Sequence, residues 1–197
     1  MAQPIGLECI RCGRPYPLTA IDRCCETCAL EGVSSNLTCQ APNQDMPDRG
    51  NIPATPSSLW KYADFLPVGI DNAVSLGEGL TPIVNVEGFG HGPIRVKDEA
   101  RNPTWSFKDR LATVAVSWAR MIGAPAIATS STGNAGAAAA AYAARAGIPC
   151  IVLTYKGAAG AIVAQMRSYG AMVLTVPEMQ DRWTILSQAI EEFGWFP

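Results

Sequence analysis

The second half of the sequence alternates short apolar stretches with segments of helical periodicity, and this alternation limits the fold more than any other feature. Strands are predicted at 94–97, 126–130, 150–154 and 172–176. Helices are predicted at about 106–122, 135–146, 159–169 and 181–193. A glycine directly follows each of the first three helices, where a chain commonly leaves the helical conformation. Strands that alternate with helices favour right-handed crossovers and a parallel sheet. The predicted fold class is therefore α/β, a parallel sheet with flanking helices.

The first predicted helix, over 106–122, has both a start signal and an apolar face. Ser106 precedes Asp109 by three residues, which resembles a capping box. The apolar residues that share one face at helical spacing are Leu111, Val114, Ala115, Trp118 and Ile122. We expect this face to pack toward the sheet.

Composition divides the 197 residues into three parts. Residues 1–32 contain most of the cysteines and are predicted to form a small metal-stabilised unit. Residues 33–58 are rich in Ser, Asn, Pro, Gln and Asp, and are predicted to be a linker. Residues 59–197 are predicted to belong to the α/β domain, with one short helix at about 59–66. Nearly half of all residues are apolar, enough to bury a core.

Charge and hydropathy exclude several classes of function. The formal net charge is −2, and lysine and arginine are not clustered, so we expect no nucleic-acid binding. The most apolar run, 135–144, is too short to cross a bilayer, and the N-terminus lacks the apolar core of a secretory signal. We therefore predict a cytoplasmic protein that does not interact with membranes.

One lysine and one turn form the strongest candidate site. Lys108 stands where a helix is predicted to begin, a place where the helix dipole and burial both favour a neutral, nucleophilic amine. Residues 131–136 form a small-residue turn between a strand and a helix, where backbone N–H groups bind anions. Taken alone, the lysine is ordinarily a solvated surface residue, and the turn a plain helix cap. Together, in this order, they indicate a pyridoxal-phosphate enzyme.

The cysteines near the N-terminus have the spacing of metal ligands. Cys9 and Cys12 form one Cys-x-x-Cys pair, and Cys25 and Cys28 form a second. Two such pairs suit tetrahedral zinc, and four sulfur ligands leave no open position, so the predicted role is structural. The alternatives are reduced structural cysteines or a redox pair, and Cys24 could replace Cys25 as a ligand.

Four motifs resemble threonine synthase, within the tryptophan-synthase-β-like group (fold type II) of pyridoxal-phosphate enzymes. They are LGEGLTP at 76–82, KDE at 97–99, NPTWSFKDR at 102–110 and SSTGNAG at 130–136. The resemblance runs from about residue 7 to the end of the chain. The motifs are specific for the group, whereas threonine and serine ammonia-lyases and cysteate synthase share much of the same pattern.

The resemblance implies a role for individual residues. Lys108 would bind pyridoxal phosphate covalently and move protons, Asn134 would hydrogen-bond the ring hydroxyl of the cofactor, and Phe107 would shield the cofactor site. The expected substrate-binding residues are Ser131, Thr132 and Gly133 for a carboxylate, with Lys97 and Arg101 for a phosphate. The implied reaction converts O-phospho-L-homoserine and water to L-threonine and phosphate, as part of threonine biosynthesis.

Two departures from the family pattern shape the remaining expectations. Trp105 stands where the family usually has glycine, three residues before Lys108, and could reshape the substrate pocket. A glycine-rich loop for the cofactor phosphate is not found, so we expect an N-terminal portion of an enzyme, with weak activity by itself. It would act as a homo-oligomer or with a complementing C-terminal half. The alternatives are a threonine or serine ammonia-lyase, a cysteate-synthase-like enzyme, and a non-catalytic zinc-ribbon binding protein.

Overall fold

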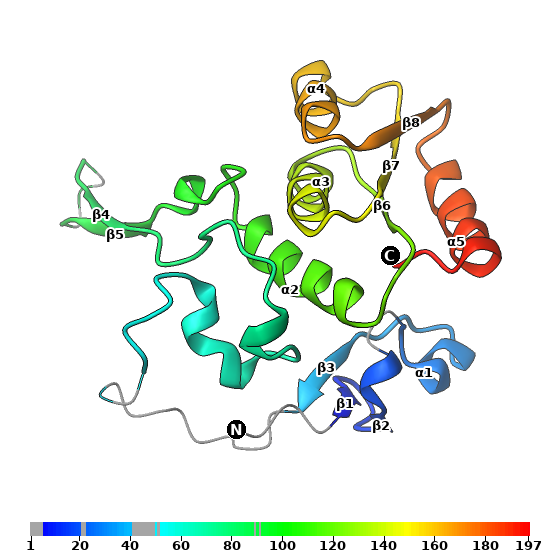
Figure 1. Ribbon diagram of the computed structural model, residues 1–197, viewed down its shortest axis with the longest axis horizontal. Helices are drawn as coiled ribbons and strands as arrows, with labels where there is room; N and C mark the ends of the chain where they lie inside the picture. The colour runs from blue at the N-terminus through cyan, green and yellow to red at the C-terminus, as the bar shows by residue number, and fades with distance from the viewer. Residues whose placement is uncertain (1–5, 21–22, 41–49, 51, 89, 91) are drawn as a thin grey trace.

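The computed structural model describes residues 6–20, 23–40, 50, 52–88, 90 and 92–197 (Figure 1). Strands in this part of the chain form a three-stranded antiparallel sheet near the N-terminus, a two-stranded hairpin, and a three-stranded parallel sheet. Helices flank the parallel sheet, so the predicted α/β class is confirmed. No helix among these residues is long and apolar enough to cross a membrane.

The N-terminal unit is larger than the sequence indicated. β1 (Gly6–Cys9) pairs antiparallel with β2 (Pro15–Tyr16) and with β3 (Leu37–Gln40), and a short helix, α1 (Glu26–Leu30), lies between the last two strands in sequence. Because β3 belongs to this sheet, the boundary predicted after residue 32 is wrong, and the unit extends to residue 40. Within the predicted linker, residues 41–49 and 51 lie outside the described residues.

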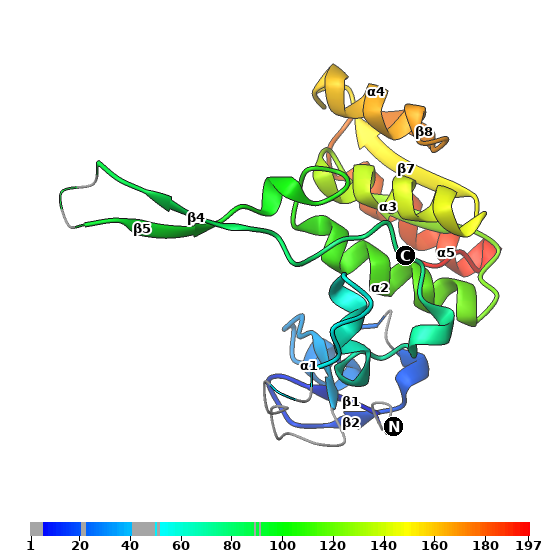
Figure 2. The ribbon, with the colours of Figure 1, turned by 60° about the vertical axis from the view of Figure 1, so that its left-hand side comes forward.

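The middle of the chain connects the N-terminal unit to the parallel sheet. The short helix predicted at 59–66 is confirmed as a 3-10 helix, η3 (Leu59–Phe65), and a second short turn, η4 (Ile70–Asn72), follows it. β4 (Ile83–Val86) and β5 (Ile94–Lys97) then pair as an antiparallel hairpin. The strand predicted at 94–97 is therefore confirmed, but it lies outside the parallel sheet. Figure 2 shows the hairpin extending away from the rest of the molecule.

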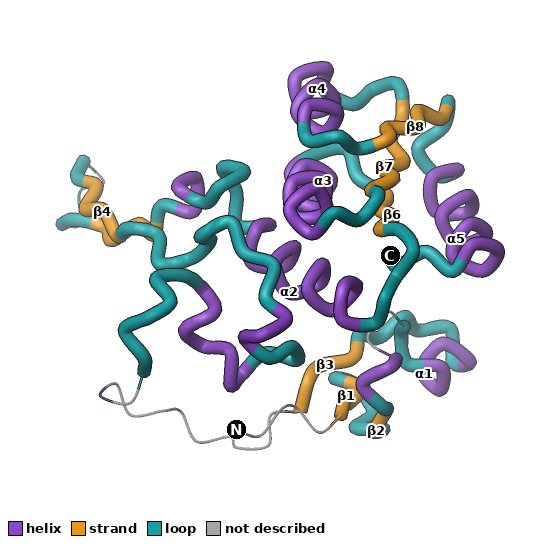
Figure 3. The backbone as a smooth tube through the Cα atoms, in the orientation of Figure 1, coloured by secondary structure: helices purple, strands orange, loops and turns teal. Residues whose placement is uncertain are grey.

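The parallel sheet and its helices occupy the C-terminal half of the chain. Its strands, in spatial order, are β6 (Ile127–Ser130), β7 (Cys150–Tyr155) and β8 (Met172–Val176). Its helices are α2 (Lys108–Met121), α3 (Asn134–Ala146), α4 (Gly160–Ser168) and α5 (Asp181–Phe193). α3 and α4 lie on one face of the sheet and α5 on the other (Figure 3). These bounds lie within two residues of the predicted ones, because apolar periodicity and glycine stops are local signals.

Small residues let α3 lie close to the sheet and to α2. Ala137, Ala138 and Ala140 are at most 1% exposed and form part of the main core. A Cβ atom added at Gly136 would lie 2.7 Å from Cε of Met166, closer than packed atoms approach. Glycine at this position therefore allows the first turn of α3 to pack directly against α4.

The buried face of α2 differs from the predicted one. Leu111 is 65% exposed and Ile122 is 53% exposed, whereas Thr113 and Ser117 are fully buried. The reason is tertiary: α2 packs against the alanine surface of α3 and against the loop before β4, and this loop offers hydrogen-bond partners. The Thr113 hydroxyl donates to the carbonyl of Val74 at 2.7 Å, so this hydroxyl is buried without losing its hydrogen bond.

A buried carboxylate joins this loop to both helices. Glu78 is fully buried, and its Oε2 accepts a hydrogen bond from the Tyr142 hydroxyl on α3 at 2.8 Å. Its Oε1 lies 2.8 Å from Thr113 Oγ1 on α2 and shares the single proton of that hydroxyl with the Val74 carbonyl. The carboxylate also accepts from the Ser75 hydroxyl at 3.1 Å and from the Leu76 backbone N–H at 2.9 Å. One side chain thus fixes the position of α2 relative to α3.

Replacement of Glu78 by alanine is expected to lower the free energy of unfolding by about 3–5 kcal/mol, since several buried donors lose their acceptor at once. Urea denaturation followed by circular dichroism would measure the loss. Glu87, which is exposed, supplies the matched control, and its alanine variant should change stability by less than about 0.5 kcal/mol. A loss under about 1 kcal/mol for the Glu78 variant would contradict this role.

Candidate active site

Lys108 is the first residue of α2, as the sequence predicted to within two residues. The Lys108 backbone N–H donates to Ser106 Oγ at 3.1 Å. The Ser106 hydroxyl therefore satisfies one of the backbone donors at the start of α2 that have no partner within the helix. The Lys108 side chain is half-buried, and its Nζ lies 4.4 Å from the centre of the Phe107 ring. The amine therefore stands at the positive end of the helix dipole, with one aromatic face beside it.

The turn before α3 is organised by Ser131. Its Oγ accepts the backbone N–H of Gly136 at 2.8 Å and that of Gly133 at 3.3 Å, and the side chain is 7% exposed. Ser131 was predicted to bind a substrate carboxylate, and in the structure its hydroxyl accepts these two N–H groups, while the residue at the N-cap of α3 is Gly133. The N–H groups of Asn134 and Ala135 belong to the first helical turn, where the helix itself provides no acceptor.

The space in front of this turn is open. A Cβ atom built on Gly133 would meet no atom within 4 Å, and Asn134 is exposed. Within the described part of the chain, the side chains of Thr132 and Asn134 form no hydrogen bond. An anionic ligand approaching the turn would thus meet free backbone donors, one hydroxyl and one amide.

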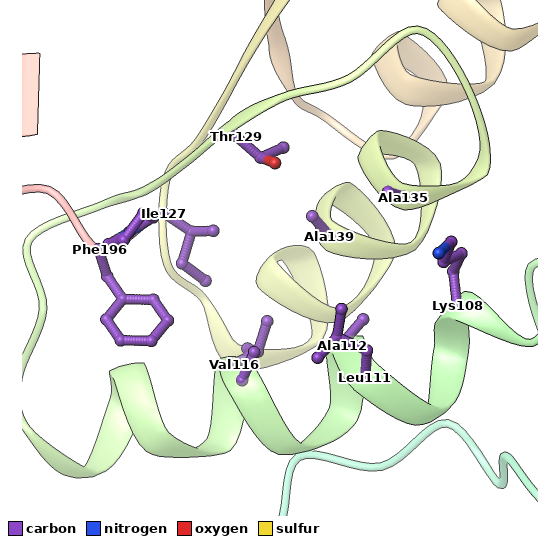
Figure 4. A pocket seen from close by; sticks show the side chains of 11 residues that line it. Lys108, Leu111, Ala112, Val116, Ile127, Thr129, Ala135, Ala139 and Phe196 are labelled. Carbon is purple, nitrogen blue, oxygen red and sulfur yellow. The ribbon is translucent and has the colours of Figure 1, made fainter. Parts of the chain in front are cut away.

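One cavity is lined by the lysine and by Ala135 of the turn, whereas the predicted site residues Ser131, Thr132, Gly133 and Asn134 are not among its lining residues. The cavity is bounded by α2, by the first turns of α3, by β6 and by the last residues of the chain. The lining residues are Lys108, Leu111, Ala112, Ala115, Val116, Ile127, Thr129, Ala135, Ala139, Phe196 and Pro197. Figure 4 shows the Lys108 side chain at one end of the cavity, directed toward the turn of α3 where Ala135 lies. The walls are otherwise mostly apolar, which is the usual character of a cofactor or small-ligand site.

The structure does not bring the two predicted phosphate partners to this cavity. Lys97, at the end of β5, donates from Nζ to the carbonyl of Thr81 at 2.8 Å. Arg101 forms an ion pair with Asp98, with Nε 3.1 Å from Oδ2. Neither side chain lines the cavity: Lys97 ends the hairpin, and Arg101 lies on the segment that connects the hairpin to α2.

That connecting segment is fixed to α2 by an ion pair that the sequence analysis missed. The carboxylate of Glu99 accepts from Arg110 Nε at 2.7 Å and Nη2 at 2.8 Å, a bidentate arrangement. The Arg110 guanidinium, with further hydrogen bonds from Thr81 and Asn102, lowers the pKa of Glu99 to about 2. The pair holds the backbone just before the lysine in one position.

Other residues of the site also escaped the sequence analysis. Leu111 and Ala115 line the cavity three and seven residues after Lys108, a spacing that places them on the same helix face. Counting from the lysine along the helix could have found them. Trp105 has φ +63°, in the left-handed region that favours glycine, and its side chain is 72% exposed. No local signal in the sequence predicts this conformation for a tryptophan.

The four predicted metal-ligand cysteines converge at the N-terminal unit. The Sγ atoms of Cys9, Cys12, Cys25 and Cys28 all lie within 4.8 Å of one another. Cys9 and Cys28 are 3.8 Å apart, and Cys12 and Cys25 are 3.6 Å apart. Tetrahedral zinc–sulfur bonds require sulfur separations of about 3.8 Å, so the cluster fits such an ion.

The surroundings of the cluster lower the pKa of two of the four thiols, whereas burial and hydrogen bonds with neighbouring cysteines raise the pKa of Cys28 to about 12 and also raise that of Cys12. Ser35 Oγ lies 3.2 Å from Cys9 Sγ, and this hydrogen bond lowers the pKa of the Cys9 thiol to about 6. The Tyr16 hydroxyl lies 3.2 Å from Cys25 Sγ and likewise lowers the pKa of that thiol. Cys24 is exposed and lies outside the cluster, so the structure selects Cys25 over Cys24 as the fourth member.

Comparison with known proteins places this geometry in a family. The model of the family described as pyridoxal-phosphate dependent enzyme matches residues 74–197. The threonine synthase of Methanocaldococcus jannaschii is 36% identical over 175 residues, which cover 86% of this chain and 42% of that protein. The threonine synthase of Mycobacterium tuberculosis H37Rv is 44% identical over 126 residues, 61% of this chain and 35% of that protein.

Solved structures give the same assignment of the fold. The crystal structure of O-ureido-L-serine synthase has a TM-score of 0.53 and 30% sequence identity, and the match covers 59% of this chain and 40% of that one. The chain spans about two fifths of the length of the threonine synthase from M. jannaschii. By its sequence and by its fold, the chain belongs to the family of pyridoxal-phosphate dependent enzymes.

Proposed function

We propose that this chain contributes to a threonine synthase, which converts O-phospho-L-homoserine and water to L-threonine and phosphate. The observation that carries the proposal is the shared cavity of Lys108 and the first turn of α3. The threonine synthases among its relatives, 36% to 44% identical, supply the substrate class. Family membership alone leaves the reaction open, because related enzymes act on other amino acids.

The residues of the cavity fit pyridoxal phosphate. Lys108, at one end of the cavity, provides the amine that would hold the cofactor aldehyde. Asn134 does not line the cavity, but its exposed amide precedes the lining residue Ala135 and would serve the ring hydroxyl. The apolar wall formed by Leu111 and Ala115 would keep water from the ring. When bound, the cofactor supplies an electron sink for chemistry next to the amino group of the substrate.

Other groups of the chain would bind the substrate and transfer protons. Thr132, Gly133 and the free N–H groups at the start of α3 would bind the substrate carboxylate, with Ser131 fixing the turn through its hydrogen bond from the Gly136 N–H. The Lys108 amine would accept and return a proton at the substrate carbons. Lys97 and Arg101 would need to leave their present partners to reach a phosphate.

The N-terminal unit is proposed to hold structural zinc. Four cysteine sulfurs at tetrahedral separations leave no position for a substrate or water, so the ion would stabilise the fold and take no part in the reaction. Free cysteines throughout the described residues fit the reducing cytoplasm that we propose as its location. We further propose no nucleic-acid or membrane partner.

An assay of two competing reactions tests the proposed activity. The chain would be given zinc and pyridoxal phosphate, alone and together with the C-terminal part of the M. jannaschii threonine synthase, since the chain covers 42% of that relative. We expect equal amounts of threonine and phosphate from O-phospho-L-homoserine in the complemented sample, and weak turnover without the complement. Release of a keto acid from threonine or serine, without phosphate release from O-phospho-L-homoserine, would instead establish an ammonia-lyase.

A further inference from the structure

A fully buried carboxylate lies directly next to Lys108 in the sequence. The Asp109 side chain, 0% exposed, accepts the Thr104 hydroxyl at 2.7 Å and the Thr104 backbone N–H at 3.2 Å from each carboxylate oxygen. Thr104 itself is 4% exposed. Asp109 does not complete the predicted capping box with Ser106, because its carboxylate turns to Thr104 instead. That expectation is therefore wrong.

These hydrogen bonds close a loop of the backbone, and we name residues 104–109, with the bonds between Thr104 and Asp109, the clamp. The clamp contains Trp105, Ser106 and Lys108. Ser106 Oγ accepts the Lys108 N–H within it, and the Trp105 N–H donates to the Asn102 carbonyl at 2.8 Å just outside it. The direction in which Lys108 leaves the backbone is therefore set by a closed ring of hydrogen bonds.

The clamp encloses the one strained residue of this segment. Trp105 has φ +63°, a conformation that a residue with a Cβ atom adopts only when its surroundings impose it. Its side chain is 72% exposed, so packing of the indole does not offset the free-energy cost of this backbone conformation. The buried, charge-assisted hydrogen bonds between Thr104 and Asp109 are strong enough to offset that cost.

We infer that Asp109 is a positioning residue for Lys108: through Thr104 it holds Trp105 in the left-handed conformation and so directs the lysine amine into the cavity. The inference rests on the proposed use of Lys108 as the cofactor-binding lysine. Without the clamp, Trp105 relaxes to negative φ, the chain direction changes three residues before Lys108, and the amine moves away from the turn of α3. Asp109 reaches neither cofactor nor substrate in this role.

Covalent labelling of lysines measures the position of the amine directly. The sequence has four lysines, Lys61, Lys97, Lys108 and Lys156, so each falls into its own assignable peptide. The full chain would be incubated with zinc and pyridoxal phosphate, reduced with borohydride, and analysed by peptide mass spectrometry. The ratio of Lys108 label to Lys156 label is the readout, because Lys156 is exposed and distant in sequence from the clamp.

For Asp109→Ala we expect this ratio to fall about tenfold, the scale on which losing hydrogen bonds to a charged group shifts an equilibrium. Thr104→Val, which removes only the hydroxyl, should lower the ratio by a smaller factor, and Thr104→Ser should leave it unchanged. Thermal melts of each variant, followed by circular dichroism, identify any loss of the fold. Should Asp109→Ala prevent folding, the two Thr104 variants still decide the question.

The double variant Trp105→Gly with Asp109→Ala separates positioning from general stability. Glycine adopts φ +63° without steric cost, so the turn no longer needs the clamp, and labelling of Lys108 should recover toward the original ratio. A purely structural role of Asp109 would leave labelling low in the double variant. Unchanged labelling in both Asp109→Ala and Thr104→Val would overturn the inference. If the unaltered chain itself shows no preference for Lys108, the proposed function fails instead.

Discussion

Exchange of Lys108 for alanine is expected to abolish covalent binding of pyridoxal phosphate at the cavity. The side chain is the only lysine among the residues that line it, and no other amine in the described part of the chain lies at this position. After reduction with borohydride, mass spectrometry should find the cofactor on the Lys108 peptide of the original chain and on no cavity peptide of the variant. The visible absorbance of the bound cofactor should disappear with it.

The matched control for this experiment is Lys156→Ala. Lys156 is exposed and is not among the residues that line the cavity, so its loss should leave the Lys108 label intact. In the complemented enzyme, Lys108→Ala should lower turnover by about 10³-fold, the range expected for loss of a proton-transferring group. Persistent labelling within the cavity of the alanine variant would contradict the assignment of this lysine.

Removal of zinc, or exchange of Cys25 for serine, is expected to unfold the N-terminal unit. The Cys9, Cys25 and Cys28 side chains are each at most 1% exposed and form a small core of their own, with Tyr16 and Leu37 packed against it. Such a core is too small to fold a unit of this size without further stabilisation. Apparent zinc-binding free energies in small metal units reach about 10 kcal/mol or more, all of which contributes to folding.

Zinc content by atomic absorption and amide exchange by NMR would test this prediction. We expect one zinc ion per chain, its loss in Cys25→Ser, and rapid exchange of the β1 amides, while the amides of β7 stay protected. Cys24→Ser is the matched control, because Cys24 is adjacent in sequence but lies outside the cluster. A Cys25→Ser variant that keeps both zinc and slow exchange in β1 would show that the ion is held in another way.

Much of the fold and part of the site followed from local patterns in the sequence. The strands at 150–154 and 172–176 and the helix at 181–193 match β7, β8 and α5 to within one residue. The lysine and the turn before α3 were identified by their order along the chain. The predicted topology does not explain why they lie near each other, because β5, the strand before Lys108, lies outside the parallel sheet. The packing of α2 against α3 brings Lys108 close to the first turn of α3.

The expectations that failed depend on partners far away in sequence. The extent of the N-terminal unit depended on β3, whose pairing with β1 joins residues about thirty apart. Lys97 and Arg101 carry the charge that a phosphate would need, but their present partners were visible only in three dimensions. The conformation of Trp105 opposes the preference of its residue type, so no propensity could have predicted it.

The sequence by itself determined the α/β class, the helix and strand bounds near the site, the family motifs that contain Lys108 and residues 130–136, and the spacing of the four converging cysteines. These depend on periodicity, glycine stops and ligand spacing, which are properties of neighbouring residues. The tertiary structure decided which face of α2 is buried, which residues line the cavity, and how Asp109 holds the turn before Lys108. Those features arise because buried polar groups must find partners, and the fold alone determines which partners lie within reach.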